Sequence, residues 1–211
     1  MKTLEQILKG MSAHLNGDTE LPTGDEYDLW VESINQTQDQ WADVDFDWDS
    51  LRKSSVVTLM QSGTSVALPS DYVKLDGYTL IGGNEYGEIR PEEVNLHTSD
   101  NYVIPYTGEK YLAIYPASAS TVDVRINYYG RPQSMTTLTS QSLCPSDNFL
   151  IYGAVEKIFL QRENQKFTEF QNRAENELSK MIGKQVVKLD QFDSSIKNEI
   201  TYKRGFTLGV D

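Results

Sequence analysis

The spacing of apolar residues changes period twice along this chain of 211 residues. Up to about residue 42, apolar residues recur every three or four positions, as on one face of an α-helix. From Ser54 they alternate with polar residues, as in β-strands with one buried face. From Ser146 the helical spacing returns. Helices from the two ends can bury their apolar stripes economically by packing together, which predicts a β lobe inserted between them.

Two helices are predicted before the first change of period. The first runs from Leu4 to about Leu15, and Thr3 and Gln6 have the spacing of a capping box at its start. The second covers roughly Asp25 to Ala42. The apolar stripes expected to be buried are Leu4, Ile7, Leu8, Met11 and Leu15 in the first helix, and Tyr27, Trp30, Val31, Ile34 and Trp41 in the second.

The middle of the chain predicts a series of short strands. Turn sequences such as Ser62-Gly63 and Gly82-Gly83-Asn84 separate them. In the last strand apolar and polar residues alternate, which predicts an antiparallel sheet with one solvent-exposed face. We expect a small β-sandwich or partly open barrel. The strand candidates are Val56–Met60, Ser65–Leu68, Tyr78–Ile81, Gly87–Arg90, Tyr102–Tyr106, Tyr111–Tyr115 and Thr121–Tyr129.

A long helix is predicted to follow a linker at residues 133–145. Ser146 is a good N-cap, and Gly183 suits the C-terminal cap. The polar run from Gln161 to Lys166 is expected to bend or interrupt this helix. The predicted fold class is therefore α+β, with a discontinuous helical bundle (residues 1–53 and 146–183), an inserted antiparallel β-sandwich or barrel lobe (54–132) and an extended C-terminal arm (184–211).

The arm carries many large apolar residues without a sustained helical or strand period. Such a segment cannot bury these residues within itself, so we expect it to become ordered on a partner, where aromatic and arginine side chains often dominate binding energy. Folding back on its own subunit is the alternative. The expected anchors are Ile200, Tyr202, Arg204, Phe206 and Leu208.

The charge of the chain argues against a direct grip on DNA. The formal net charge is −12, and residues 25–51 hold nine acidic residues and no lysine or arginine. Binding to phosphates needs clustered basic residues. Cys144 is the only cysteine, which rules out an internal disulfide, favours a cytoplasmic origin and predicts a buried thiol. We expect neither a membrane span nor a signal peptide.

Motifs for catalysis, cofactors and metals are missing from the sequence. Gly82 and Gly87 have the spacing of a phosphate loop, but Glu88 stands where the lysine should be. With only two histidines and one cysteine, there is no G-x-S-x-G elbow, H-E-x-x-H motif or cysteine–histidine cluster. We therefore expect a protein that is not an enzyme and has no cofactor.

The stretch from Asp43 to Ser50 reads DVDFDWDS and resembles the start of an EF-hand calcium loop. That loop needs glycine at its sixth position and glutamate at its twelfth, where this chain has Trp48 and Ser54. We expect no metal here. Instead Trp41, Phe46 and Trp48 are predicted to anchor the crossing from the helical part to the β part, with Val44 beside them. The aspartates are expected to be hydrated or to face a neighbouring subunit.

The order of the sequence features resembles a known family. Two N-terminal helices that lead to a tryptophan pair precede the segments ALPSDYVKL, IRPEEV, YVIPYTGEKYLAIYP, VDVRINYYGRP and CPSDNFLIYGAVEKIFLQREN. This series, over roughly Leu4 to Met181, resembles the head-to-tail adaptors of short-tailed bacteriophages, the group that includes tail tubular protein A.

The resemblance implies a structural virion protein at the head–tail junction, assembled in the host cytoplasm. Such an adaptor forms a ring with itself, usually a dodecamer, that docks beneath the portal protein and accepts the tail nozzle or tail tube protein. Double-stranded DNA passes through the bore during ejection without sequence-specific binding, and an acidic lining would let it slide. On this interpretation the arm lies against the portal or an adjacent subunit, with Tyr202, Arg204 and Phe206 as its main anchors.

Two other functions fit the same sequence. One is a stopper or tail-completion protein of another tailed-phage type, which differs in its neighbours rather than its chemistry. The other is a carbohydrate- or receptor-binding β module of a virion, suggested by the tyrosine-rich strands. An exposed aromatic cleft would distinguish the β module from a ring-forming subunit.

Overall fold

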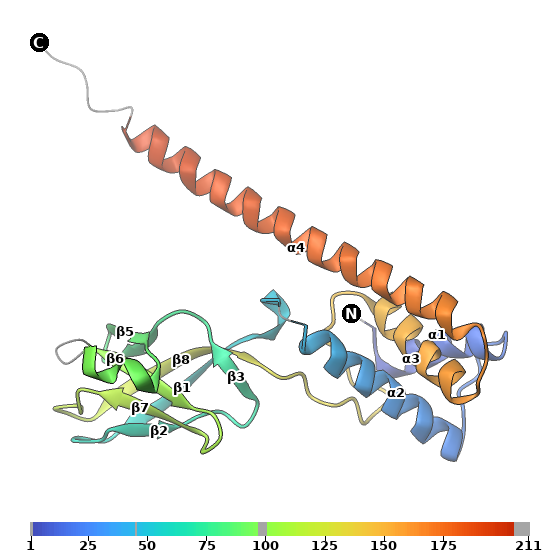
Figure 1. The fold of residues 1–211 in the computed structure, drawn as a ribbon, viewed down its shortest axis with the longest axis horizontal. Coiled ribbons are helices and arrows are strands. Elements are labelled where there is room, and N and C mark those ends of the chain that lie inside the picture. The colour runs from blue at the N-terminus through green and yellow to red at the C-terminus, as the bar shows by residue number, and fades with distance from the viewer. Residues whose placement is uncertain (1, 45, 97–100, 205–211) are drawn as a thin grey trace, which may run out of the picture. The chain divides into compact units, whose positions relative to one another are not determined.

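A computed structural model describes residues 2–44, 46–96 and 101–204, with side chains for residues 2–44, 46–94, 96 and 101–186. The chain divides into two compact units (Figure 1). The helical unit comprises Met1–Phe46 and Ser134–Asp211, and the β unit comprises Asp47–Gln133. The predicted α+β class is confirmed: helices from both chain ends form one bundle, and the β lobe is an insertion in the sequence between them.

The helical unit is built around α3 (Asp147–Gln161). α1 (Leu4–Leu15), α2 (Asp25–Ala42) and α4 (Phe167–Arg204) each pack against it. Figure 1 shows the N-terminal helices beside α3 and α4. Trp30 and Ile34 of α2 and Leu150 and Val155 of α3 are fully buried, as expected for a shared core. The prediction that helices from the two ends of the chain pack together is confirmed.

The N-terminal caps of α1 and α3 are the ones that the sequence predicted. At the start of α1 the Gln6 N–H donates to Thr3 Oγ1 at 3.4 Å, and the Thr3 N–H donates to Gln6 Oε1 at 3.1 Å. This is the predicted capping box, which satisfies two backbone donors that the first helical turn leaves unpaired. At the start of α3 the Phe149 N–H donates to Ser146 Oγ at 3.3 Å, which confirms Ser146 as N-cap.

The segment that returns from the β unit to α3 is held by polar contacts to the N-terminal helices. Asn35 of α2 donates to the backbone oxygen of Met135 (3.1 Å) and accepts from its N–H (2.8 Å). Ser142 Oγ donates to Gln38 Oε1 at 2.7 Å, in a buried hydrogen bond. Cys144 is buried, as predicted, and burial raises the pKa of its thiol to about 12. These bonds pair polar groups whose burial alone would be costly.

The long C-terminal helix is interrupted once and then passes the expected stop. After α3 the chain turns at Glu163, which has a positive φ of 51°, and α4 begins at Phe167, so the polar run does interrupt the helix. The prediction that Gly183 ends the helix is wrong, because α4 continues through it to Arg204. An exposed glycine inside a helix costs only about 1 kcal/mol, which the surrounding helix-forming residues can offset.

The C-terminal arm is therefore helical as far as Arg204, and it extends beyond the packed bundle. Met181 and Gln185 are the last buried residues of α4 among those whose side chains are described. Within the described part of the chain, no helix has the length and apolar character that crossing a membrane requires.

The β unit is a nearly closed, mostly antiparallel barrel. In the described residues its sheet has the strand order β1-β8-β4-β5-β6-β7-β2, with β3 also paired to β8. The two ends of this path, β1 and β2, approach each other. One pair, β5–β6, is parallel, so the sheet is mixed. The strands are β1 (Arg52–Leu59), β2 (Ser65–Ala67), β3 (Tyr72–Leu75), β4 (Thr79–Ile81), β5 (Asn84–Glu88), β6 (Tyr102–Tyr106), β7 (Tyr111–Tyr115) and β8 (Val122–Gly130).

The predicted alternation in the last strand is confirmed. Val124 and Ile126 of β8 are fully buried, whereas Asp123 and Arg125 are exposed. The sequence did not predict β3, which lies between the strand candidates Ser65–Leu68 and Tyr78–Ile81. The core of the barrel consists of Leu59, Val66, Leu68, Leu75, Ile81, Val103, Leu112, Ile114, Val124, Ile126 and Tyr128.

We expect two glycine-to-alanine changes to have opposite effects on stability. A Cβ at Gly153 of α3 would lie 2.5 Å from Thr37 Cγ2 of α2, so Gly153→Ala should lower the free energy of unfolding by about 1–3 kcal/mol. A Cβ at Gly183 meets nothing within 4 Å, so Gly183→Ala should raise it by about 0.5–1 kcal/mol. Urea unfolding followed by far-UV circular dichroism measures both.

The second glycine change also tests the helix end. If Gly183 instead adopted the left-handed conformation of a helix cap, Gly183→Ala would destabilise the protein. For Gly153→Ala, adding Thr37→Ser removes the clashing methyl group and should restore part of the loss. A Gly153→Ala protein as stable as the wild type would contradict the close approach of α2 and α3.

Candidate functional site

The acidic stretch between α2 and β1 joins the two units. Asp43 is the C-cap residue of α2, and its N–H donates to the Asp39 carbonyl at 2.9 Å. Trp41 in the helical unit and Trp48 in the β unit are both fully buried, and Phe46 is half-buried. Asp45 lies outside the described residues. The boundary between the units falls directly after Phe46. That these aromatic residues act together as an anchor stays a prediction.

Two of the aspartates in this stretch form ion pairs within the β unit. Asp47 pairs with Lys74 of β3 at 2.5 Å, and Asp49 lies 3.6 Å from Arg52 of β1. Both cations also lie over the ring of Tyr129, at 5.3 Å for Lys74 and 5.6 Å for Arg52. Arg52 Nε donates to the Tyr129 hydroxyl at 2.9 Å. Two of the four aspartates in this stretch, Asp47 and Asp49, are therefore neutralised by basic side chains without a metal ion.

The described residues contain no group of three or more histidine, cysteine, aspartate or glutamate side chains placed to hold a metal ion. An EF-hand site needs several oxygen ligands that converge on one cation. The carboxylates of Asp47 and Asp49 face basic side chains instead.

The base of α4 is fixed by an aromatic cluster. The Phe170 ring lies 5.3 Å from His14 of α1 and 6.0 Å from Tyr152 of α3. The Arg173 guanidinium lies over Phe170 (5.1 Å) and Tyr152 (5.7 Å), in cation–π geometry. Burial lowers the pKa of His14, and the positive charge of Arg173 lowers it further, against the opposing charge of Glu169. The first turns of α4 are thus held firmly on the bundle.

The predicted arm anchors fall at or beyond the far end of α4. Ile200, Tyr202 and Arg204 belong to its last turns, and their side chains are not among those described. Phe206 and Leu208 lie outside the described residues. Their role as anchors therefore stays a prediction.

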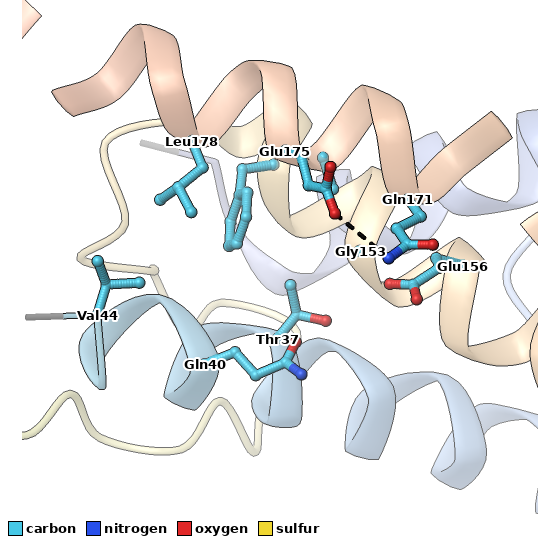
Figure 2. A pocket seen from close by; sticks show the side chains of 10 residues that line it. Thr37, Gln40, Val44, Gly153, Glu156, Gln171, Glu175 and Leu178 are labelled. Atoms are coloured by element: carbon cyan, nitrogen blue, oxygen red, sulfur yellow. Dashed lines mark hydrogen bonds between the residues drawn. The ribbon is translucent and has the colours of Figure 1, made fainter. Parts of the chain in front are cut away.

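A groove between α2, α3 and α4 is a feature that the sequence did not predict (Figure 2). Its volume is about 330 Å³. At its floor Gly153 allows α3 to approach Thr37 of α2 closely. Gln171 Nε2 donates to Glu175 Oε1 at 3.3 Å. The lining residues are Thr37, Gln40, Val44, Phe149, Gly153, Glu156, Gln171, Ala174, Glu175 and Leu178.

Two carboxylates from different helices share this groove. Burial raises the pKa of Glu156, and the charge of Glu175 raises it further, whereas neighbouring Lys157 opposes both. Lys157 Nζ donates to Gln40 Oε1 at 2.6 Å, and burial lowers the pKa of this lysine. The arrangement has no nucleophile paired with a base, so it suits a polar contact surface better than catalysis. Glu156 and Glu175 lie on different helices, so no local motif links them in the sequence. The only sequence signal for either residue is its position in a helical pattern.

The comparison with family models gives the identity of the chain. The model described as SU10 adaptor protein matches residues 3–196, which covers both units and most of α4. The chain belongs to the SU10 adaptor protein family. No curated protein sequence matches it.

Family membership makes this adaptor a structural phage protein and a component of the virion. Adaptors of this kind associate with portal and tail proteins. The relevant sites are therefore interaction surfaces, and the candidates in this adaptor are the α4 arm, the groove and the outer faces of both units.

We expect no stoichiometric calcium binding by the adaptor in isothermal titration calorimetry, because Asp47 and Asp49 already pair with Lys74 and Arg52. An EF-hand protein such as calmodulin serves as the positive control. Tight binding of one calcium ion, abolished by Asp47→Asn, would show that the ion pairs open to form a metal site.

We expect Glu156→Gln to stabilise the helical unit at neutral pH, by about 1–3 °C in melting temperature. The raised pKa of Glu156 means that folding favours the protonated form, so stability is lost as pH rises from its ordinary pKa to its folded pKa. The gain should therefore disappear at about pH 4, where the carboxyl group is protonated. Thermal melts at both pH values measure it. Glu20→Gln in an exposed loop is the control, and an equal gain there would contradict this account.

Proposed function

We propose that this adaptor forms a dodecameric ring that docks beneath the portal and accepts the tail nozzle, as in the tail tubular protein A group. The ring would form part of the channel through which DNA is ejected. The observation that carries this proposal is the family match over residues 3–196.

The length of α4 supports a docking role. The helix has 38 residues, which corresponds to about 57 Å at 1.5 Å per residue. From Gln185, its last buried residue among those with described side chains, about 29 Å of helix continue to Arg204. A helix held firmly at its base by Phe170 and Arg173 can present its far end to a partner. We assign this far end to the portal.

The charge supports a channel that does not retain DNA. The formal net charge of the chain is −12. An acidic channel lining repels duplex DNA, so the DNA can move past without binding.

The alternative functions gain no specific support. In β6 and β7, Tyr102 stacks on Tyr115 (5.0 Å) and Tyr106 stacks on Tyr111 (4.8 Å). These rings cover one another, whereas a carbohydrate-binding module presents open aromatic faces to the sugar. A stopper or tail-completion protein would differ only in its neighbours.

Deletion of residues 200–211 tests the docking role of the arm. The truncated protein should stay folded, because the described buried core of the bundle is built from residues up to Gln185, but its affinity for purified portal rings should fall by about 100-fold. Sedimentation velocity of adaptor, portal and their mixture measures docking and the number of bound subunits. Full-length adaptor should be monomeric alone and form a ring on the portal.

The control is an adaptor in which residues 200–211 are shuffled, so that composition and charge are kept. It should dock as poorly as the truncated protein if the sequence of the arm matters. Unchanged docking of the truncated protein would show that the arm is not the anchor. If full-length adaptor does not bind portal rings at all, the proposed function itself is wrong.

A further inference from the structure

The outer face of the β unit carries an exposed apolar patch. A depression of about 430 Å³ is lined by Val56 of β1, Leu80 of β4, Val122 and Arg125 of β8, the Gly82-Gly83 turn and Asp123. We call this surface the β-patch. Val56 has 57% of its surface exposed, although it lies in the middle of a paired strand. The register places Arg125 opposite both Val56 and Leu80, so the guanidinium-bearing residue lies between two apolar residues.

Arg125 differs from the other basic residues of this sheet. Arg52, Lys53 and Lys74 each form an ion pair within the β unit. Arg125 makes no hydrogen bond or ion pair with any described residue. Asp123, at the edge of the β-patch, has its Oδ1 3.5 Å from the Thr58 hydroxyl. An unpaired arginine beside exposed apolar side chains is the chemistry that binds a carboxylate-bearing protein surface.

The helical unit presents a surface of that kind. Asp25, Asp28, Glu32 and Asp39 of α2 are all exposed, and their spacing puts them along one face of the helix. We call them the acidic stripe. Gln36, on the same face, donates to Glu32 Oε1 at 3.1 Å. None of the four carboxylates forms an ion pair with a described residue.

A closed ring needs two different surfaces on every subunit, because each copy contacts its neighbours head to tail. The β-patch is a largely apolar hollow that carries an unpaired arginine, with Asp123 at its edge, whereas the acidic stripe lies on a convex helix. We propose that the β-patch of one copy binds the acidic stripe of the next copy, with Arg125 paired to Glu32. This inference rests on the proposed ring and names the contact that closes it.

Both surfaces are small, so we expect the contact between them to form stably only when subunits assemble on the portal ring. Exposed ion pairs are weak singly, and specific interfaces that are stable by themselves bury far more surface than one such patch provides. Assembly on a portal ring raises the effective concentration of neighbouring subunits, so many weak contacts can close together.

A charge swap tests the pairing. Arg125→Glu and Glu32→Arg should each weaken assembly of the adaptor on portal rings by about tenfold or more, because each places like charges together. The double variant with both changes restores an opposite pair, and its assembly should return to within about threefold of the wild type. Sedimentation velocity measures assembly, and circular dichroism checks that each variant is folded.

Arg90→Glu is the matched control, since Arg90 is an exposed arginine of the same unit outside the β-patch. It should assemble like the wild type. If the wild type forms rings and both single variants do so equally well, or if the double variant is no better than either single one, the pairing is wrong.

Cross-linking gives a readout that does not depend on the portal. Protein with Val56→Cys and protein with Gln36→Cys should form a mixed disulfide faster than either forms one with itself at high concentration. Cys144 should add little background, because it is buried and its thiol pKa is about 12. Mixed disulfide without portal binding would overturn the proposed function but support this contact. No preference for the mixed disulfide would overturn the contact.

Discussion

The structure depends on the burial of α3. Its buried residues lie around most of the helix, so it must be packed between several helices rather than on one face. α1, α2 and α4 supply those neighbours, although two of them precede the β unit and one follows α3 directly. The remaining helical packing follows from this requirement, including the close approach at Gly153 and the aromatic cluster at the base of α4.

An inserted unit must begin and end at neighbouring points, and the β unit meets this condition within its own sheet. Its first strand, β1, pairs antiparallel with its last strand, β8, along their full length from Arg52–Tyr129 to Leu59–Val122. After β8, the return segment is fixed to α2 by Asn35 and Gln38. The insertion therefore leaves the helical core intact, because the chain leaves and re-enters the bundle at defined places.

The distribution of charge pairs separates structural residues from those available to partners. Lys53 bonds to Asp71, which also accepts from the Tyr128 hydroxyl, and Lys74 and Arg52 pair with Asp47 and Asp49. These groups stabilise the β unit and its connection. Arg125 and the acidic stripe of α2 take no part in such pairs among the described residues. For a family of structural adaptors, surfaces of this kind are the natural places to look for assembly contacts.

The sequence by itself determined the elements whose signals are local. Helical spacing and caps such as Thr3 and Ser146 gave α1, α2 and α3, and the alternation around Val124 and Ile126 gave β8, because these signals act between residues close in the chain. Only the tertiary structure decided the contacts between distant segments. It paired β3 with β8 and β5 with β6, joined Glu156 and Glu175 in one groove, and left Arg125 unpaired. At Gly183 a local stop signal was overridden, because a modest glycine penalty is smaller than the gain from continuing a helix with good helix-forming residues on both sides.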